Sequence, residues 1–281
     1  MGATTFLETE NLTLSFGGVT AVDHLTIQIP PKQITGVIGP NGAGKTSFFN
    51  CLTGVYRPNE GSIRFCGQEI CGLSPDAIAR LGMIRTFQNL RLFPRLSVWE
   101  NLLSGFTRRY LSSPGQELLG LGKGKSGQKA MAEQASMLLA STGLSGREEV
   151  LAGDLPYGDR KRLEWARALA AQPKLLLLDE PAAGLNHGEK EELLALLNHC
   201  QKERDMAILL IEHDMELISA ATEHLIVLDQ GRLLAQGNPT EVLRLPEVAR
   251  AYLGKGEERE KWENPCCGSM GSPSVTIRWK S

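Results

Sequence analysis

A glycine-rich run near the N-terminus has the residue types and spacing needed to hold phosphate. Residues 39–46 read Gly-Pro-Asn-Gly-Ala-Gly-Lys-Thr and match the pattern Gly-x-x-x-x-Gly-Lys-[Ser/Thr]. Glycines let the backbone curl so that successive N–H groups point into one concavity, and Lys45 adds a positive charge. The Thr46 hydroxyl is a suitable Mg²⁺ ligand. The residues expected to hold a nucleotide are Gly39, Pro40, Asn41, Gly42, Ala43, Gly44, Lys45, Thr46 and Ser47.

Two acidic residues follow an apolar run in the second half of the chain. Residues 175–178 are four leucines, a pattern typical of a parallel strand buried on both faces, and Asp179 and Glu180 come directly after them. A carboxylate at the end of such a strand can reach Mg²⁺, which we expect of Asp179. Glu180 would orient or deprotonate the water that attacks the γ-phosphate. Alone, the pair would more often be an ordinary strand end, but the phosphate loop upstream favours the catalytic interpretation.

The elements around these motifs follow from hydrophobic periodicity. Residues 34–38 predict a buried strand that enters the glycine-rich loop, and residues 45–52 predict a helix that leaves it, whose N-terminus favours an anion. Residues 6–30 alternate apolar and polar around a pair of glycines, which indicates a β-hairpin or antiparallel strands. Residues 61–70 predict another strand pair around a Cys-Gly turn.

The second half of the chain alternates strands with helices. Apolar runs at 208–211 and 225–228 repeat the pattern of the leucine strand, and this alternation predicts a mostly parallel α/β sheet. Ser97, with Glu100 three residues on, predicts a capping box at a helix start. Residues 107–128 are rich in Gly, Ser and Lys and are interpreted as a flexible insertion. Helices are predicted at 75–81, 97–106, 129–142, 158–171, 187–203, 214–222 and 239–254.

Composition narrows the class of protein. The chain has 281 residues, 42% hydrophobic and 22% charged, as is ordinary for soluble globular proteins. A formal net charge of −2 gives no electrostatic case for binding nucleic acid. No apolar run approaches the roughly 20 residues that span a bilayer, and the N-terminus lacks a secretory signal pattern. The six cysteines fit no metal-binding spacing and are interpreted as reduced thiols, so the sequence predicts a cytoplasmic protein.

A third motif, Leu155-Pro156-Tyr157-Gly158-Asp159, stands before a predicted helix. With it, the order of motifs resembles that of ATP-binding cassette (ABC) ATPases, namely phosphate loop, glutamine, signature, Asp-Glu strand and histidine. The resemblance covers roughly residues 5–254. The family usually has Leu-Ser-Gly-Gly-Gln at the signature, so this chain lacks the serine hydroxyl that donates to the γ-phosphate. Gly158 and the N-terminus of the following helix still offer backbone donors.

The resemblance assigns roles to two further polar residues. Gln88 matches the glutamine that joins the Mg²⁺ shell or holds the attacking water, and residues 90–103 would form the groove that docks a membrane partner. His213 matches the histidine that contacts the γ-phosphate and orders the catalytic glutamate. The catalytic set is therefore expected to be Lys45, Gln88, Glu180 and His213, and the metal set Thr46, Gln88 and Asp179.

The resemblance also implies contacts with the base and across a dimer. Phe16 lies where the family stacks an aromatic ring on adenine, the alternative being a core position in its strand. Tyr157, Gly158 and Asp159 match the part of the signature that reaches the ATP held by a partner subunit. Asn186 stands in the loop that crosses the dimer interface, at a position where the family more often has Asp.

The fold implied by the resemblance is an α/β P-loop NTPase of the ABC cassette type. Such a cassette has a mostly parallel RecA-like core sheet, an antiparallel β subdomain and a helical signature subdomain. We expect the cassette to occupy residues 1–254, with the helical subdomain at about 89–172. Residues 255–281 are charged and then rich in Gly, Ser and Pro, and are predicted to be a disordered tail.

The function implied is that of the ATP-hydrolysing subunit of an ABC importer, with ATP and Mg²⁺ as cofactors. The signature and the ending at 246–254 look like the subgroup that powers branched-chain amino acid uptake. Importers of urea, short-chain amides or other amino acids are the alternative. The expected partners are a second ABC ATPase subunit, either a paralogue or a second copy, two integral-membrane permeases and, indirectly, a periplasmic or extracellular substrate-binding protein. Nucleic acid is not expected as a partner, and the expected location is the cytoplasmic face of the inner (plasma) membrane.

Two other classes of function stay open at this stage. ABC-type ATPases that act on DNA or ribosomes usually carry two cassettes or long coiled coils, whereas this chain shows one cassette and no sustained heptads. The other is a regulatory or scaffold cassette that does not hydrolyse ATP, an alternative that Pro156 and Asn186 keep open. The complete set of Lys45, Asp179, Glu180 and His213 argues against it.

Overall fold

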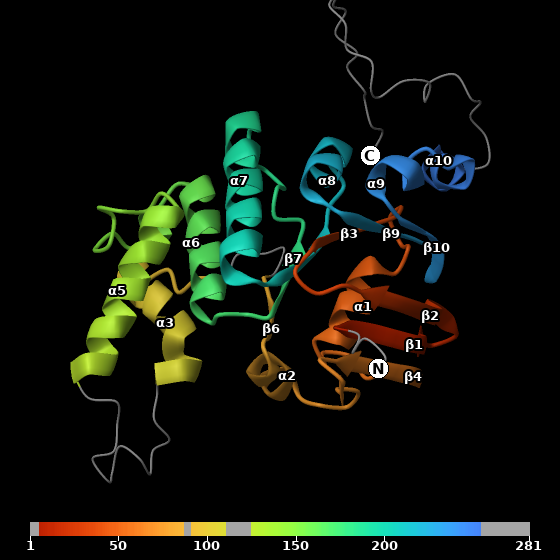
Figure 1. The fold of residues 1–281 in the computed structure, drawn as a ribbon, viewed down its shortest axis with the longest axis horizontal. Helices are drawn as coiled ribbons and strands as arrows, with labels where there is room; N and C mark the ends of the chain where they lie inside the picture. Colours follow the sequence, from red (N-terminus) through yellow and green to blue (C-terminus); the bar gives the residue numbers. More distant parts are fainter. Residues whose placement is uncertain (1–5, 87–90, 111–124, 254–281) are drawn as a thin grey trace, which may run out of the picture.

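The computed structural model of the chain describes residues 6–86, 91–110 and 125–253. Within them, the strands form two sheets, and helices pack between the sheets and beside the larger one (Figure 1). Gln88 and the tail from residue 255 lie outside the described residues, so the predictions for them stay predictions.

The smaller sheet is antiparallel and has the strand order β2-β1-β4-β5. Its strands are β1 (Leu7–Phe16), β2 (Val19–Ile29), β4 (Glu60–Phe65) and β5 (Gln68–Glu69). β1 and β2 are joined by Gly17 and Gly18, whose φ values of 51° and 93° are readily adopted by glycine. The structure confirms both the hairpin and the second strand pair that the sequence predicts.

The larger sheet is mostly parallel and has the strand order β10-β9-β3-β8-β7-β6. Its strands are β3 (Ile34–Ile38), β6 (Met83–Arg85), β7 (Leu175–Asp179), β8 (Ala207–Ile211), β9 (His224–Asp229) and β10 (Arg232–Gly237). Every residue of β3, β7 and β8 is buried, as the continuous apolar runs predict. Since these three strands are parallel, their carboxyl ends meet at one edge of the sheet, where ligands bind in open α/β folds.

The helices follow the predicted positions closely. They are α1 (Lys45–Leu52), α2 (Pro75–Leu81), α3 (Val98–Tyr110), α5 (Lys125–Ser141), α6 (Tyr157–Ala170), α7 (His187–Arg204), α8 (Met215–Ala221), α9 (Pro239–Val242) and α10 (Pro246–Leu253), with a short 3₁₀ turn at Ala152–Asp154. The predicted capping box of α3 is present, because Glu100 N donates to Ser97 Oγ at 3.1 Å and Ser97 N donates to Glu100 Oε2 at 2.8 Å.

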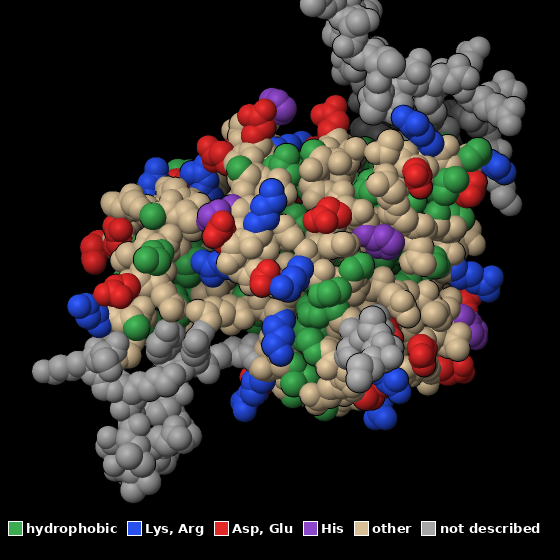
Figure 2. All heavy atoms as spheres, viewed as in Figure 1, with side chains coloured by type: hydrophobic (Ala, Val, Ile, Leu, Met, Phe, Trp, Pro, Cys, Tyr) green, Lys and Arg blue, Asp and Glu red, His purple; other side chains and the backbone are tan. Residues whose placement is uncertain are grey.

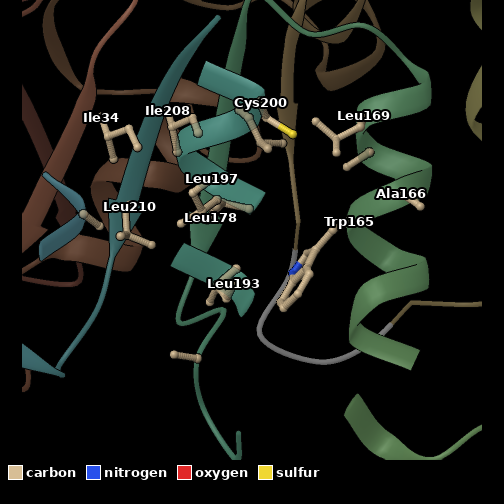
Figure 3. Close-up of a cluster of buried hydrophobic side chains, with 14 of the residues drawn as sticks. Ile34, Trp165, Ala166, Leu169, Leu178, Leu193, Leu197, Cys200, Ile208 and Leu210 are labelled. Carbon is tan, nitrogen blue, oxygen red and sulfur yellow. The ribbon is translucent and has the colours of Figure 1, made fainter. Parts of the chain in front are cut away.

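Side chains alternate along the buried strands and so build two separate cores. In β7, Leu175 and Leu177 face the core that holds α1 and the smaller sheet, whereas Leu176 and Leu178 face the core beneath α6 and α7. Figure 3 shows this second core, in which the labelled side chains of β7 and β8 lie beside those of α7, with Trp165 pointing in from α6. The central sheet is therefore covered by packed structure on both faces.

Helices α3, α5 and α6 pack on one another at one end of the molecule, seen at the left of Figure 1. A Cβ at Gly105 would overlap the carbonyl oxygen of Arg167, so glycine allows α3 to approach α6 closely. The prediction of a flexible insertion over residues 107–128 is wrong at both ends, because α3 continues to Tyr110 and α5 begins at Lys125. Glycine and serine there suggested a loop, but an established helix extends readily when its neighbours pack against it. Residues 111–124 lie outside the described residues.

The last predicted helix, at 239–254, is split into two. α9 ends at Val242 and α10 begins at Pro246. Proline has no backbone N–H and cannot continue a preceding helix, but it fits the first position of a new one.

Acidic and basic side chains are interspersed over the face seen in Figure 2, in keeping with the small net charge. Among the described residues, none of the helices combines the length and apolar character needed to cross a membrane.

Candidate functional site

The glycine-rich loop joins β3 to α1, as predicted, and its glycines are required by geometry. Gly39, Gly42 and Gly44 have φ values of 154°, 82° and 94°, which residues with a side chain rarely adopt. A Cβ at Gly39 would overlap the Leu228 carbonyl oxygen, and one at Gly44 would overlap the Ala21 carbonyl oxygen. The loop is thus pressed between β9 and β2, and its curled backbone is fixed by both.

The start of α1 is suited to an anion. Within the described residues, no side chain caps this helix and no acidic residue stands in its first turn. The first backbone N–H groups of a helix have no partner inside the helix, and the helix dipole is positive at this end. Thr46 is exposed and Ser47 is half-buried in this first turn. The arrangement can hold the phosphates of a nucleotide.

Lys45 lies inside the loop rather than in solvent. Its Nζ donates to the carbonyl oxygens of Gly39 at 2.6 Å and Pro40 at 3.0 Å. Burial lowers the pKa of Lys45, and the nearby carboxylates of Glu180 and Asp179 oppose that shift. The structure therefore brings Lys45 close to Asp179 and Glu180, which stand 134 and 135 residues after it in the sequence (179 − 45 and 180 − 45).

Asp179 ends β7 as a buried carboxylate with a charged partner. Arg85 Nη2 donates to Asp179 Oδ2 at 2.6 Å, and Arg85 Nη1 donates to Asn50 Oδ1 at 2.6 Å. The two charged side chains are only 6% and 7% exposed. Arg85 also stacks over the Phe49 ring at 5.5 Å, so it links the end of β6 to both Asp179 and α1.

Glu180 and His213 form a hydrogen-bonded pair beside this lysine. Glu180 Oε1 lies 2.8 Å from His213 Nε2, and both side chains are accessible to solvent. The backbone of Glu180 has a φ of 50°, a strained value for a residue with a side chain, and its N–H donates to Ile211 O at 2.9 Å. A carboxylate held by an imidazole next to a phosphate loop can accept a proton from a water molecule.

The signature residues occupy the first turn of α6, after Pro156 at the N-cap. Tyr157 is exposed, and its hydroxyl donates to Ala183 O at 3.4 Å. A Cβ at Gly158 would meet the Glu189 carboxylate, which is the movable end of a flexible side chain. The buried Asp159 carboxylate accepts from Arg147 and, at 3.3 Å, from Arg162. Asp159 is thus paired within its own chain, which an isolated motif does not reveal.

Phe16 is a surface residue of the hairpin. It is 46% exposed, so the alternative of a core position is wrong. Its ring meets that of Tyr56 edge-to-face at a centroid distance of 5.0 Å. The hairpin that carries it presses on the phosphate loop at Ala21. The exposed Phe16 ring, supported by Tyr56 from the segment after α1, has a face for a flat base.

The ABC transporter family model matches residues 22–183 of the chain, which include the loop, the signature, Asp179 and Glu180. This chain belongs to the ABC transporter family. It is accordingly a nucleotide-binding cassette and an ATPase.

Similar proteins extend this assignment over nearly the whole cassette. The chain is 45% identical to a high-affinity branched-chain amino acid transport ATP-binding protein, BraF, of Pseudomonas aeruginosa, over 89% of this chain and 98% of that protein. It is 41% identical to the protein of the same description, LivG, from Escherichia coli K12, again over 89% and 98% of the two chains.

Solved structures of ABC cassettes share the fold. A nucleotide-free ATP-binding cassette from an ABC transporter superposes with a TM-score of 0.74 and 31% identity, covering 89% of this chain and 100% of the other. The ADP conformation of MJ1267, an ATP-binding cassette of an ABC transporter, superposes with a TM-score of 0.77 and 31% identity, covering 90% of this chain and 100% of the other. The predicted ABC cassette fold is confirmed.

The sequence motifs did not predict two residues of the cassette site. Glu212 stands beside His213 and is buried, and Arg85 stands three residues before Gln88. The sequence did contain a signal for Glu212. It is an acidic residue directly after an apolar strand, just as Asp179 is an acidic residue at the end of one. Arg85 gave no such signal, because its partner is 94 residues away in the sequence.

Replacing Arg85 is expected to destabilise the ABC cassette. Arg85→Met leaves the Asp179 carboxylate buried without its charged partner, and breaking a buried ion pair in this way costs about 3 kcal/mol or more. Urea unfolding of the two proteins measures the difference. Arg80→Met is the matched control, because its pair with Asp76 is 74% and 67% exposed and should contribute no more than about 0.5 kcal/mol. Equal losses for the two variants would contradict the assigned role of the Arg85 pair.

Proposed function

We propose that this chain is the ATP-hydrolysing subunit of an importer that takes up branched-chain amino acids through separate permease subunits. The hydrogen bond between Glu180 and His213, beside the Lys45 loop, is the observation that carries the hydrolytic part of the proposal. The substrate follows from the two relatives, which are described as branched-chain amino acid transport proteins and match the cassette over nearly their whole length.

In the proposed reaction, the loop and the helix start bind the phosphates of ATP. Lys45 contacts the β- and γ-phosphates, while backbone N–H groups of residues 42–47 donate to their oxygens. Glu180 orients a water molecule for in-line attack and accepts its proton, and His213 holds Glu180 and contacts the γ-phosphate. Phe16 stacks on the adenine. Gln88 completes the set as predicted from the sequence.

The residues at the loop fit Mg²⁺. Asp179 and Thr46 supply a carboxylate and a hydroxyl, which are the hard oxygen ligands that this ion prefers. Arg85 donates to Oδ2 of Asp179, so the carboxylate is held in a fixed orientation at the end of β7. When bound, Mg²⁺ neutralises charge that develops on the phosphate oxygens. Thr46 and Asp179 would hold it, together with the Gln88 amide.

The proposal includes a second ATPase subunit. Tyr157 and Gly158 lie on the first turn of α6, and Tyr157 is exposed there to a partner. In a head-to-tail dimer this turn contacts ATP held by the other subunit, and the other signature does the same in return. Two permeases and a substrate-binding protein complete the importer, and the cassette works at the cytoplasmic face of the inner membrane.

The assembly is tested by measuring turnover with its partners present. The chain alone should hydrolyse ATP slowly, with a turnover per chain that rises with protein concentration, since dimers form by mass action. Membranes containing the permeases and a leucine-loaded binding protein should raise it by about tenfold or more. The control is the same membranes with leucine-free binding protein. Turnover that is independent of both concentration and permeases would contradict the proposal.

A further inference from the structure

The two residues that follow Glu180 are held from two sides by buried charged groups. Lys161 Nζ, from the second turn of α6, donates to the carbonyl oxygen of Pro181 at 2.8 Å. Glu212 Oε1, from the end of β8, accepts from the backbone N–H of Ala182 at 2.6 Å. The single peptide unit that joins Pro181 to Ala182 is therefore fixed through its carbonyl on one side and through its N–H on the other.

Lys161 and Glu212 are both deeply buried, each being only 4% exposed. Burial lowers the pKa of Lys161 and raises the pKa of Glu212, and the opposite charge of Glu212 partly counteracts the shift at Lys161. Taking charged groups out of water is unfavourable unless hydrogen bonds and opposite charges compensate. Here the compensating partners are the backbone atoms next to Glu180.

Glu212 also reaches the other member of the catalytic pair. Its second oxygen, Oε2, accepts from the backbone N–H of His213 at 3.1 Å. A single carboxylate thus ties the segment after Glu180 to the segment that carries His213. The ring of His213 and the carboxylate of Glu180 are 2.8 Å apart, and this separation depends on both backbones.

The conformation of Glu180 needs such support. A residue with a side chain at a φ of 50° carries a strain of roughly 1–3 kcal/mol and persists only where its surroundings determine it. The contacts of Pro181 and Ala182 lie directly beside it in the chain. Removing either contact is expected to let Glu180 relax away from His213.

Lys161 lies on helix α6, which is held in place by packing against its neighbours. One turn further along, Trp165 is buried and points from α6 toward the side chains of α7, as Figure 3 shows. On the preceding turn, the Tyr157 ring lies under Lys161 Nζ at 5.4 Å from its centroid. The signature turn, Lys161 and the loop after Glu180 are therefore in continuous contact.

We propose that Lys161 and Glu212 are positioning residues that hold Glu180 against His213, and that Lys161 connects the signature turn to the catalytic glutamate of the same chain. The proposal rests on the role of Glu180 given above. It adds a route within one subunit by which movement of α6, when its signature turn binds ATP of a partner, changes the geometry of that subunit's own Glu180.

The test uses the assembled importer in membranes, with Lys161→Met, Glu212→Gln and Glu212→Ala. Each should lower kcat for ATP hydrolysis by roughly 10- to 100-fold, while KM for ATP stays within about threefold of wild type. Glu212→Ala should be worse than Glu212→Gln, because the glutamine carbonyl can still accept one of the two backbone N–H bonds. Unchanged kcat in Lys161→Met and Glu212→Gln, or losses that appear in KM alone, would overturn the proposal.

A double-mutant comparison separates positioning from general damage. Residual hydrolysis in a Glu180→Gln background is measured by single turnover of radiolabelled ATP. In this background Lys161→Met should reduce the rate by less than about twofold, because the carboxylate that Lys161 positions has already been replaced. If the double variant loses the product of the two single fold losses in rate, Lys161 acts independently of Glu180, and the proposal is overturned. Wild-type turnover by Glu180→Gln alone would instead refute the role of Glu180 on which the proposal rests.

Lys190→Met is the matched control. Lys190 Nζ donates to Asp214 Oδ2 at 2.6 Å, a lysine contact in the same region that is 34% exposed and does not involve Pro181 or Ala182. It should keep kcat within about twofold of wild type. A loss as large as that of Lys161→Met would count against a specific role for Lys161.

Discussion

Glu180→Gln is expected to lower kcat for ATP hydrolysis by about 10²- to 10⁴-fold, the range associated with losing a general base. The amide keeps the shape of the carboxylate but cannot accept a proton from water. It can still form a hydrogen bond with His213 Nε2, so the local geometry should persist. The loss should therefore fall on the chemical step rather than on folding or ATP binding.

The measurement is steady-state turnover of the assembled importer together with equilibrium binding of ATP. Binding should stay within about threefold of wild type, since Glu180 is not among the groups that contact the phosphates. Glu191→Gln is the control, because Glu191 is 71% exposed on α7 and pairs there with His187 rather than with His213. A variant with intact turnover would show that another group is the base, and a variant that loses ATP binding would show that Glu180 acts in the ground state.

Lys45→Ala is expected to weaken ATP binding by roughly 100-fold or more. Lys45 Nζ lies within hydrogen-bond distance of two loop carbonyls, so the ammonium is already placed at the loop. Charge-assisted hydrogen bonds to two phosphate groups contribute about 1.5–3 kcal/mol each, and 1.4 kcal/mol corresponds to tenfold in affinity. Isothermal titration with ATP measures the change in Kd.

Thermal unfolding distinguishes this loss from misfolding. Burial disfavours the charged form of Lys45, so truncating it removes an unfavourable desolvation as well as its contacts. We therefore expect a Tm close to that of wild type. Lys32→Ala is the control, because Lys32 pairs with Asp205 in solvent and should leave ATP affinity unchanged. Unaltered ATP affinity in Lys45→Ala would contradict the assignment of the phosphate site.

The fold was predictable where local sequence determines local structure. The bounds predicted for the strand at 34–38 and the helix at 45–52 agree with β3 and α1, because a buried apolar run and a glycine loop leave little choice. The three-residue strand β6 was missed, since a run of this length has no recognisable period. The segment at 107–128 was misread, because composition alone does not reveal that α3 is supported by contact with α6.

The site was predictable as a set of motifs but not as a set of contacts. Sequence patterns indicated Lys45, Asp179, Glu180 and His213, and the structure brings them to one edge of the sheet. The partners of these residues depend on tertiary structure, as the pairing of Arg85 with Asp179 illustrates. Likewise, Asp159 was taken from the signature as a nucleotide contact, whereas its carboxylate is paired with Arg147 and Arg162. Whether a backbone atom of this turn reaches a partner's ATP stays a prediction.

The central claim is that hydrolysis at Glu180 drives amino acid uptake, and uptake of radiolabelled leucine into proteoliposomes tests it most directly. The vesicles contain the permeases and both ATPase subunits, with ATP on the cassette side and the binding protein on the other. We expect leucine uptake that depends on ATP. Unlabelled isoleucine and valine should compete with the labelled leucine, whereas urea should not. Glu180→Gln in this chain should lower that uptake sharply although the complex still assembles and binds ATP. Leucine uptake that is unaffected by Glu180→Gln, or ATP-dependent uptake of urea in place of leucine, would contradict the account.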